Sequence, residues 1–122
     1  MLYFTSDLHL GDEKVLISRN GRPFSNIEEM NNTIIDNINR VVGEDDELWI
    51  LGDFAFRVDK AEVQKFRNRI NCRNVHLVYG NHDQDYSQEH IFQSVQYYKE
   101  LKTPYGIVVL FHYPIMEWYG AS

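Results

Sequence analysis

The chain has 122 residues, of which 43% are hydrophobic and 14% aromatic, and it carries a net charge of −6. These values predict one ordinary globular domain, exclude an intrinsically disordered chain, and argue against tight binding to a nucleic-acid backbone. No apolar run approaches the roughly 20 residues that cross a bilayer, the N-terminus does not resemble a signal peptide, and Cys72 is the single cysteine. We therefore expect a cytoplasmic protein without disulfides or membrane contact.

The pattern of apolar residues predicts an α/β domain. In chain order, the expected elements are a strand at residues 2–6, a short helix at 13–18, a helix at 25–42, a strand at 47–51, a helix at 58–70, and strands at 74–79, 94–101 and 106–111. Ser25 and Glu28 fit a capping box at the start of the helix at 25–42. The order of the elements indicates that the first three strands are parallel.

Side chains that can bind metal follow four of the expected strands. They are Asp7 and His9, then Asp53, then Asn81 and His82, and finally His112. Loops from several strands converge at the carboxyl edge of an α/β sheet, and mixed oxygen and imidazole donors suit divalent cations. Asp7 and His9, two positions apart, would share one side of an extended segment. Gly52 and Gly80 precede two of these positions, where glycine permits a sharp turn or a close approach.

Each of these residues also has a purely structural interpretation. Asp7 and Asp53 are typical of turns or helix N-caps, and Asn81 is typical of a left-handed turn. The metal interpretation depends on the joint position of all of them after strands. His76 differs because it lies inside an expected strand, so we interpret it as structural or exposed. The spacing of His90 indicates no role.

Four motifs, in order, resemble those of the calcineurin-like metallophosphoesterase family. They are SDLHLG (residues 6–11), LGDF (51–54), YGNHD (79–83) and FHYP (111–114), and together they span nearly the whole chain. The stretch RPFSNIEEM (22–30) is similar to a small bacterial and phage branch of metallophosphatases. The resemblance implies a four-layer α/β-β/α sandwich and a site for two divalent metal ions.

The resemblance also implies a role for each site residue. Asp7 and His9 match ligands of the first ion, Asp53 matches the bridging carboxylate, and Asn81 and His112 match ligands of the second ion. His82 matches a histidine that donates a proton to the substrate or stabilises its phosphate, and Asp83 is its expected orienting partner. Manganese is the first choice of metal, with iron, zinc, nickel and magnesium as alternatives. No separate organic cofactor is implied.

The family's fifth motif, Gly-His-x-His, does not occur in these 122 residues. We therefore expect the single domain, residues 1–122, to lack the last strands of the family fold and two imidazole ligands. A sheet edge left open in this way invites pairing with a second copy, so a homodimer through that edge is the assembly we consider.

Residues and resemblance together predict metal-dependent hydrolysis of a small phosphomonoester or phosphodiester by activated water. The alternative is a degenerate metal-binding or interaction module without catalysis. A nuclease is the third interpretation, which the acidic balance disfavours. Arg19, Arg22 and Arg57 fall in or near the site loops, and each is interpreted equally as a phosphate partner or as a solvated surface charge.

Overall fold

The computed structural model describes residues 1–17 and 22–113. The elements, in chain order, are β1 (Leu2–Thr5), α1 (Lys14–Ile17), α2 (Ile27–Val41), β2 (Glu47–Leu51), α3 (Lys60–Arg69), β3 (Asn74–Val78), β4 (Ser94–Gln96), β5 (Lys99–Thr103) and β6 (Gly106–Leu110). The first four strands form a sheet in the order β1-β2-β3-β4, and every pair in it is parallel. The expected α/β class and the parallel first strands are therefore confirmed. Across the described ranges, no helix has the length and apolar character needed to span a bilayer.

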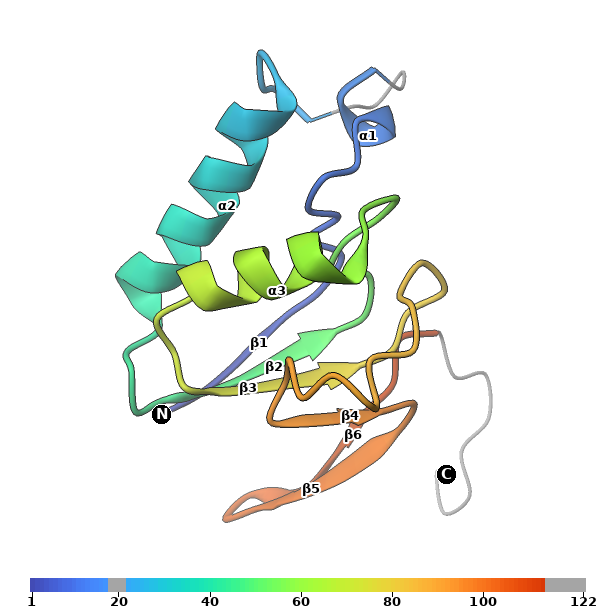
Figure 1. Cartoon of the computed structure of the whole chain (residues 1–122). Coiled ribbons are helices and arrows are strands. Elements are labelled where there is room, and N and C mark those ends of the chain that lie inside the picture. Colours follow the sequence, from blue (N-terminus) through green and yellow to red (C-terminus); the bar gives the residue numbers. More distant parts are fainter. Residues whose placement is uncertain (18–21, 114–122) are drawn as a thin grey trace.

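The parallel sheet lies between a helical layer and a β-hairpin. In Figure 1, α2 and α3 cover one face of the sheet, and the antiparallel pair β5–β6 lies against the other face. Side chains of a strand alternate between the two faces. Leu48 and Ile50 of β2 accordingly belong to the larger core with the helices, whereas Trp49 packs in a smaller core with Val78 and Leu110. Of the four layers expected, the described residues form these three, and no helix among them covers the outer face of the hairpin.

One expected strand is divided in two. The strand predicted at residues 94–101 consists of β4, which pairs in parallel with β3, and β5, which pairs with β6 in the second sheet. Tyr97 and Tyr98 separate the two pieces where the chain leaves one sheet for the other. The local sequence has strand character on both sides of this point, so only the pairing partners distinguish the two strands.

The start of α2 is displaced by one residue from the expected capping box. Asn26 is the N-cap, and its side-chain oxygen accepts a hydrogen bond of 2.8 Å from the Glu29 N–H group. Glu29 in turn accepts a hydrogen bond of 2.9 Å from the Ser25 N–H group. The expected capping box of Ser25 and Glu28 is therefore not formed: Asn26 caps the helix, and the Glu29 side chain reaches back to the N–H group of Ser25. Asparagine and serine cap helices about equally well, so the register depends on which side chains of the helix reach the core.

His76 is structural, as its place inside a strand predicted. Its Nδ1 atom lies 2.6 Å from Ser94 Oγ on the neighbouring strand β4. Its ring stacks on Trp49, with ring centroids 4.2 Å apart and planes 10° from parallel. Burial lowers the pKa of His76, and the nearby Glu47 opposes this shift only in part. The neutral ring is therefore the form that the folded sheet favours.

We predict that protonation of His76 destabilises the fold at mildly acidic pH. Because the pKa of this imidazole is lower in the folded chain than in the unfolded chain, the unfolded state binds more protons, and stability falls as pH falls through the unfolded value of about 6.5. Urea unfolding of the metal-free chain between pH 7.5 and 5 should show a smaller loss of stability for His76→Gln than for the parent.

The exposed His90 offers a matched control, since His90→Gln should leave this pH dependence unchanged. Equal slopes for the parent and His76→Gln would contradict the assignment.

Candidate metal centre

Three loops meet at the carboxyl edge of the parallel sheet. The Asp7 loop (residues 6–12) follows β1, the Asp53 loop (52–57) follows β2, and the Asn81 loop (80–83) follows β3. Backbone hydrogen bonds join the first two loops, from the Asp7 N–H group to the Gly52 carbonyl (3.0 Å) and from the His9 N–H group to the Asp53 carbonyl (2.9 Å). The expected convergence of strand ends at one edge is present.

The five residues that the sequence proposes as metal ligands lie in one cluster. Donor atoms of Asp7, Asp53 and His112 all fall within 4.8 Å of one another. The Asp53 Oδ2 atom is 3.4 Å from His9 Nε2 and 3.7 Å from His112 Nε2. His112 Nε2 also lies 3.2 Å from Asn81 Oδ1, and His9 Nε2 lies 3.8 Å from Asp7 Oδ1. Asp53 Oδ2 therefore stands between the two imidazoles.

Both imidazoles are held through Nδ1, which leaves Nε2 toward the cluster. His9 Nδ1 lies 2.9 Å from Asp12 Oδ2, and His112 Nδ1 lies 2.9 Å from the Leu51 carbonyl oxygen. A carboxylate and a carbonyl only accept hydrogen bonds, so the proton of each neutral ring is on Nδ1. The lone pairs of both Nε2 atoms then face the oxygens of the cluster. Such converging lone pairs repel one another unless a cation or a proton lies between them, so this donor set fits a divalent cation.

Asp53 is the buried member of the cluster. The residue is 3% exposed, whereas the Asp7 side chain is 53% exposed. One carboxylate oxygen, Oδ1, accepts a hydrogen bond of 2.9 Å from the His82 N–H group. The other oxygen is left for the two imidazoles. A carboxylate removed from water is costly without partners, so this position requires compensating charge or donors.

Left-handed backbone brings Asp7 and His9 into the cluster. Asp7, His9 and Asp53 have φ angles of 54°, 53° and 54°, a region that residues other than glycine seldom occupy. The extended segment that we expected at Asp7 and His9 is thus not the reason why the two side chains lie together. Two left-handed residues fold the chain back on itself, and the loop is held in that shape by its bonds to the Asp53 loop.

Two glycines make room for the cluster. A Cβ atom at Gly52, where φ is +91°, would lie 2.1 Å from His112 Nδ1. A Cβ atom at Gly80 would lie 2.2 Å from Asp53 Oδ1. Real atoms do not approach so closely, so both positions require glycine because the side chains of His112 and Asp53 pack directly on the backbone.

His82 lies at the margin of the cluster and Asp83 lies beneath it. The His82 ring is 4.3 Å from the Phe56 ring and 5.6 Å from the His9 ring, measured between centroids. Asp83 Oδ2 accepts hydrogen bonds of 2.8 Å from the N–H groups of Asp53 and Gly80, and Oδ1 accepts one of 2.9 Å from Phe54. Burial raises the pKa of Asp83, and these three N–H groups oppose the rise. No hydrogen bond between described residues joins Asp83 to the His82 ring, and the carboxylate instead ties the Asp53 and Asn81 loops together.

Asp12 is a site residue that the sequence reading missed. The residue is 4% exposed. Its Oδ2 atom accepts a hydrogen bond from His9 Nδ1, and its Oδ1 atom accepts one from the Lys14 N–H group. Partners of this kind set the tautomer and the orientation of a metal-binding histidine. The available signal was an aspartate three residues after a candidate ligand, but this spacing has meaning only once the left-handed turn at His9 is known.

The three arginines near the site have different surroundings. The Arg22 guanidinium donates hydrogen bonds to the carbonyl oxygens of Asp7 and Leu8, so it is in contact with the backbone of the Asp7 loop. Arg57 is exposed and lies over an aromatic ring of the Asp53 loop, 5.0 Å from the ring centre. Arg19 lies outside the described residues.

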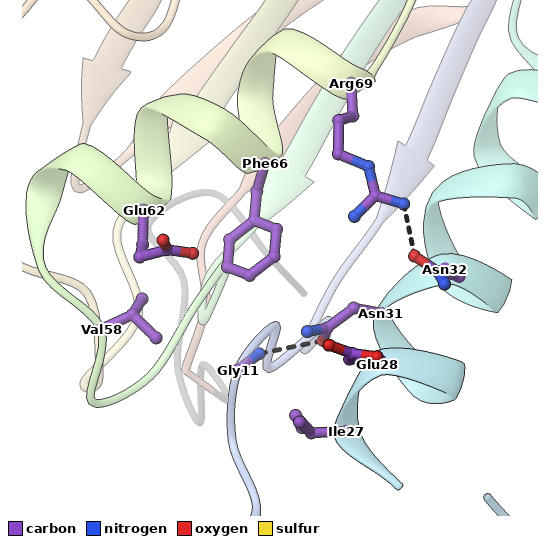
Figure 2. A pocket seen from close by; sticks show the side chains of 9 residues that line it. All are labelled: Gly11, Ile27, Glu28, Asn31, Asn32, Val58, Glu62, Phe66 and Arg69. Atoms are coloured by element: carbon purple, nitrogen blue, oxygen red, sulfur yellow. Dashed lines mark hydrogen bonds between the residues drawn. The ribbon is translucent and has the colours of Figure 1, made fainter.

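Two hollows open near the Asp7 loop. One is a cavity of about 580 Å³ between α2 and α3. Phe66 lines one wall, and the side-chain oxygen of Asn31 accepts a hydrogen bond from the Gly11 N–H group (Figure 2). None of the five candidate ligands lines this cavity. A second hollow, of about 450 Å³, adjoins the cluster through Asp12, and its other lining residues are Gly11, Glu13, Lys14 and Arg57.

The parallel sheet and its edge cluster of carboxylates and imidazoles define an α/β protein with a candidate metal centre. The family model described as calcineurin-like phosphoesterase matches residues 2–120 of the chain. The chain therefore belongs to the calcineurin-like phosphoesterase family, a family that typically binds divalent metals.

Similar proteins come from an archaeon, a phage and a bacterium. The uncharacterized protein MJ1445 of Methanocaldococcus jannaschii is 40% identical over 84 residues, which are 67% of this chain and 46% of that protein. The gene 66 protein of Mycobacterium phage L5 is 36% identical over 83 residues, which are 66% of this chain and 39% of that protein. The crystal structure of AQ665 from Aquifex aeolicus, a protein of unknown function, superposes with a TM-score of 0.75 at 30% identity and covers 93% of this chain and 61% of its own. The matched parts are thus less than half of the two curated relatives.

We predict that Gly52→Ala disturbs the cluster beyond ordinary backbone strain. An alanine at positive φ costs about 1–2 kcal/mol, and at Gly52 its Cβ atom would also displace the His112 ring. Urea unfolding should show a greater loss of stability than this strain alone, and titration with Mn²⁺ should show weaker binding.

Gly106 provides the control, because it has a φ of +129° and no atom within 4 Å of the added Cβ. Gly106→Ala should lose only the stability that backbone strain costs, and its Mn²⁺ binding should be unchanged. Equal effects of the two substitutions would show that the close approach to His112 is unimportant.

Proposed function

We propose that this chain carries the site of a metal-dependent phosphoesterase, which hydrolyses a small phosphomonoester or phosphodiester with an activated water. The observation that carries the proposal is the buried Asp53 Oδ2 atom, which stands 3.4 Å and 3.7 Å from the Nε2 atoms of two imidazoles on different loops. A single oxygen shared in this way suits a carboxylate that bridges two cations.

Each ion would have three protein ligands. Asp7, His9 and Asp53 would hold the first, and Asp53, Asn81 and His112 would hold the second. When bound, two divalent ions supply Lewis-acid stabilisation of the phosphoryl oxygens and an acidified water. Manganese is our first choice of metal, and the mixed oxygen and imidazole donors of the cluster also suit iron, zinc or nickel.

His82 is our candidate for proton donation to the leaving group, or for a hydrogen bond to the phosphate. Its backbone N–H group is bonded to Asp53 Oδ1, so the position of this residue is tied to the centre of the cluster. The ring rests between Phe56 and His9 and is half-buried. A ring that is held at the margin by packing can face a substrate without taking the place of a ligand. Acid–base groups of this kind contribute roughly 10²–10⁴-fold to turnover.

The substrate in this proposal is small and anionic. Lys14 and Arg57 line the hollow that adjoins Asp12, and neither has an ion-pair partner among the described residues. The positively charged side chains of Lys14 and Arg57 could therefore bind the oxygens of a phosphate ester beside the cluster. The net charge of −6 argues against tight binding to a nucleic-acid backbone.

The complete four-layer sandwich belongs to the same proposal. Ile107 on the hairpin is 62% exposed, which suits a sheet face that a further layer would cover. The hairpin has only two strands among the described residues, so each strand has an edge without a partner there. Pairing of such an edge in a homodimer is the assembly that the proposal includes.

The proposal is tested by measuring metal binding and hydrolysis together. Calorimetric titration with Mn²⁺ should detect two ions, and bis(p-nitrophenyl) phosphate should be hydrolysed only when the metal is present. Asp53→Asn should weaken the binding of both ions by more than roughly 100-fold, the upper range for the loss of an outer partner, because it removes a charge that both would share. His112→Ala should weaken mainly one ion.

Asp36→Asn, an exposed change on α2, is the matched control and should behave as the parent. Full two-ion binding in Asp53→Asn would remove the bridging role. Two-ion binding without hydrolysis in the parent chain would favour the non-catalytic binding module.

A second prediction concerns His82. His82→Ala should retain both ions and lose turnover by roughly 10²–10⁴-fold, with a smaller loss for nitrophenyl esters than for alkyl esters, since good leaving groups need less protonation. His90→Ala, at an exposed loop position, should have no effect. Equal losses for both kinds of ester would argue for phosphate stabilisation in place of proton donation.

A further inference from the structure

Arg22 connects three separate parts of the chain beside the cluster. Its guanidinium donates to the carbonyl oxygens of Asp7 and Leu8, and Nη1 also lies 3.8 Å from Met30 Sδ on α2. Its backbone N–H group donates to the Val15 carbonyl on α1, at 2.8 Å. Arg22 is thus held at its backbone by α1 and at its guanidinium by the backbone of the Asp7 loop.

The two carbonyls that Arg22 contacts have no other donor among the hydrogen bonds of the described residues. The N–H groups of Asp7 and His9 pair with the Asp53 loop, but the left-handed backbone at both positions takes this segment out of the sheet ladder. The Asp7 and Leu8 oxygens are therefore turned away from the strand that would otherwise supply donors. The Leu8 oxygen lies in a partly buried contact and needs a donor, which the guanidinium supplies. The contact with the Asp7 oxygen is exposed, and there the guanidinium takes a place that water could also fill.

The chemistry of arginine suits this position. A planar guanidinium presents several N–H groups in a rigid fork, so it can bind two consecutive carbonyls at once, whereas an ammonium group is a point charge on a flexible stem. Arg22 has no ion pair with a carboxylate in the described parts of the chain. Its contacts are to backbone oxygens, so what it determines is the shape of the loop.

We propose that Arg22 is a positioning residue for the metal centre. It holds the backbone of Asp7 and Leu8 in the conformation that brings the Asp7 carboxylate and the His9 imidazole to Asp53. This inference rests on the proposed function, because it assigns Arg22 a purpose in binding the first ion.

Positioning and simple electrostatics make opposite predictions. If Arg22 acted only through its charge, its removal would strengthen the binding of a cation nearby, and a lysine in its place would change little. If it acts by holding the loop, then Arg22→Gln weakens metal binding although a positive charge is lost. Arg22→Lys weakens it too, because an ammonium cannot reproduce the fork. Outer partners of metal ligands are worth about 10–100-fold in affinity, which is the loss we expect for Arg22→Gln.

The test uses the full chain and two measurements. The first is amide hydrogen exchange of the metal-free chain, in which Arg22→Gln should accelerate exchange at His9 and Leu10, whose N–H groups bond to the Asp53 loop, relative to Ile50 in the middle of β2. The second is calorimetric titration with Mn²⁺ for the parent, Arg22→Gln and Arg22→Lys. Arg40→Gln, an exposed arginine on α2, is the control and should match the parent in both measurements.

The outcomes separate this inference from the proposed function. If the parent binds no Mn²⁺, the proposed function fails, and selective exchange at His9 and Leu10 still shows whether Arg22 holds the loop. If the parent binds Mn²⁺ and Arg22→Gln binds it equally well or better, the positioning role is overturned. Uniform acceleration of exchange through β2 would likewise overturn it, because it would show a general loss of stability.

Discussion

A carboxylate buried between two imidazole rings is the constraint on which the rest of this structure depends. Asp53 is 3% exposed, and its two oxygens are divided between the His82 N–H group and the rings of His9 and His112. A charge withdrawn from water in this way is tolerated only where partners converge on it. The partners come from the ends of β1, β3 and β6, so the cluster requires the sheet and the hairpin to be in place.

The space around Asp53 is limited by backbone as much as by side chains. Gly80 lies so close to its carboxylate, and Gly52 so close to the His112 ring, that neither can carry a Cβ atom. The Asp83 carboxylate joins the Asp53 and Asn81 loops, because it accepts hydrogen bonds from N–H groups of both. These are short-range contacts between rigid groups. The loops therefore have little freedom to shift without losing the cluster, which suits a site whose donors must be preorganised.

Much of the fold could be predicted because its signals are local. The expected bounds of β2 are those of the structure, since an apolar run between a charged turn and Gly52 has one interpretation. The end of α2 was less certain: Val41, the last residue of the helix, is 52% exposed, and Val42 is buried instead. The helix ends at Val41, and the extended backbone of the next residue turns that side chain into the core. The division of residues 94–101 between two sheets likewise depends on pairing partners that are distant in the chain.

For the site, the sequence by itself indicated which residues gather. Asp7, His9, Asp53 and Asn81 follow strands whose carboxyl ends meet in the parallel sheet, and His112 follows β6 of the hairpin. It also determined that glycine stands at positions 52 and 80. The tertiary structure decided how they gather. The backbone is left-handed at Asp7 and His9. This conformation lets the Asp12 carboxylate reach His9, and the Arg22 guanidinium contacts the carbonyls of the Asp7 loop. None of these features follows from a periodic pattern in the sequence. Periodicity reports which face a residue occupies, whereas the partner of a polar atom depends on chain reversals that no local pattern encodes.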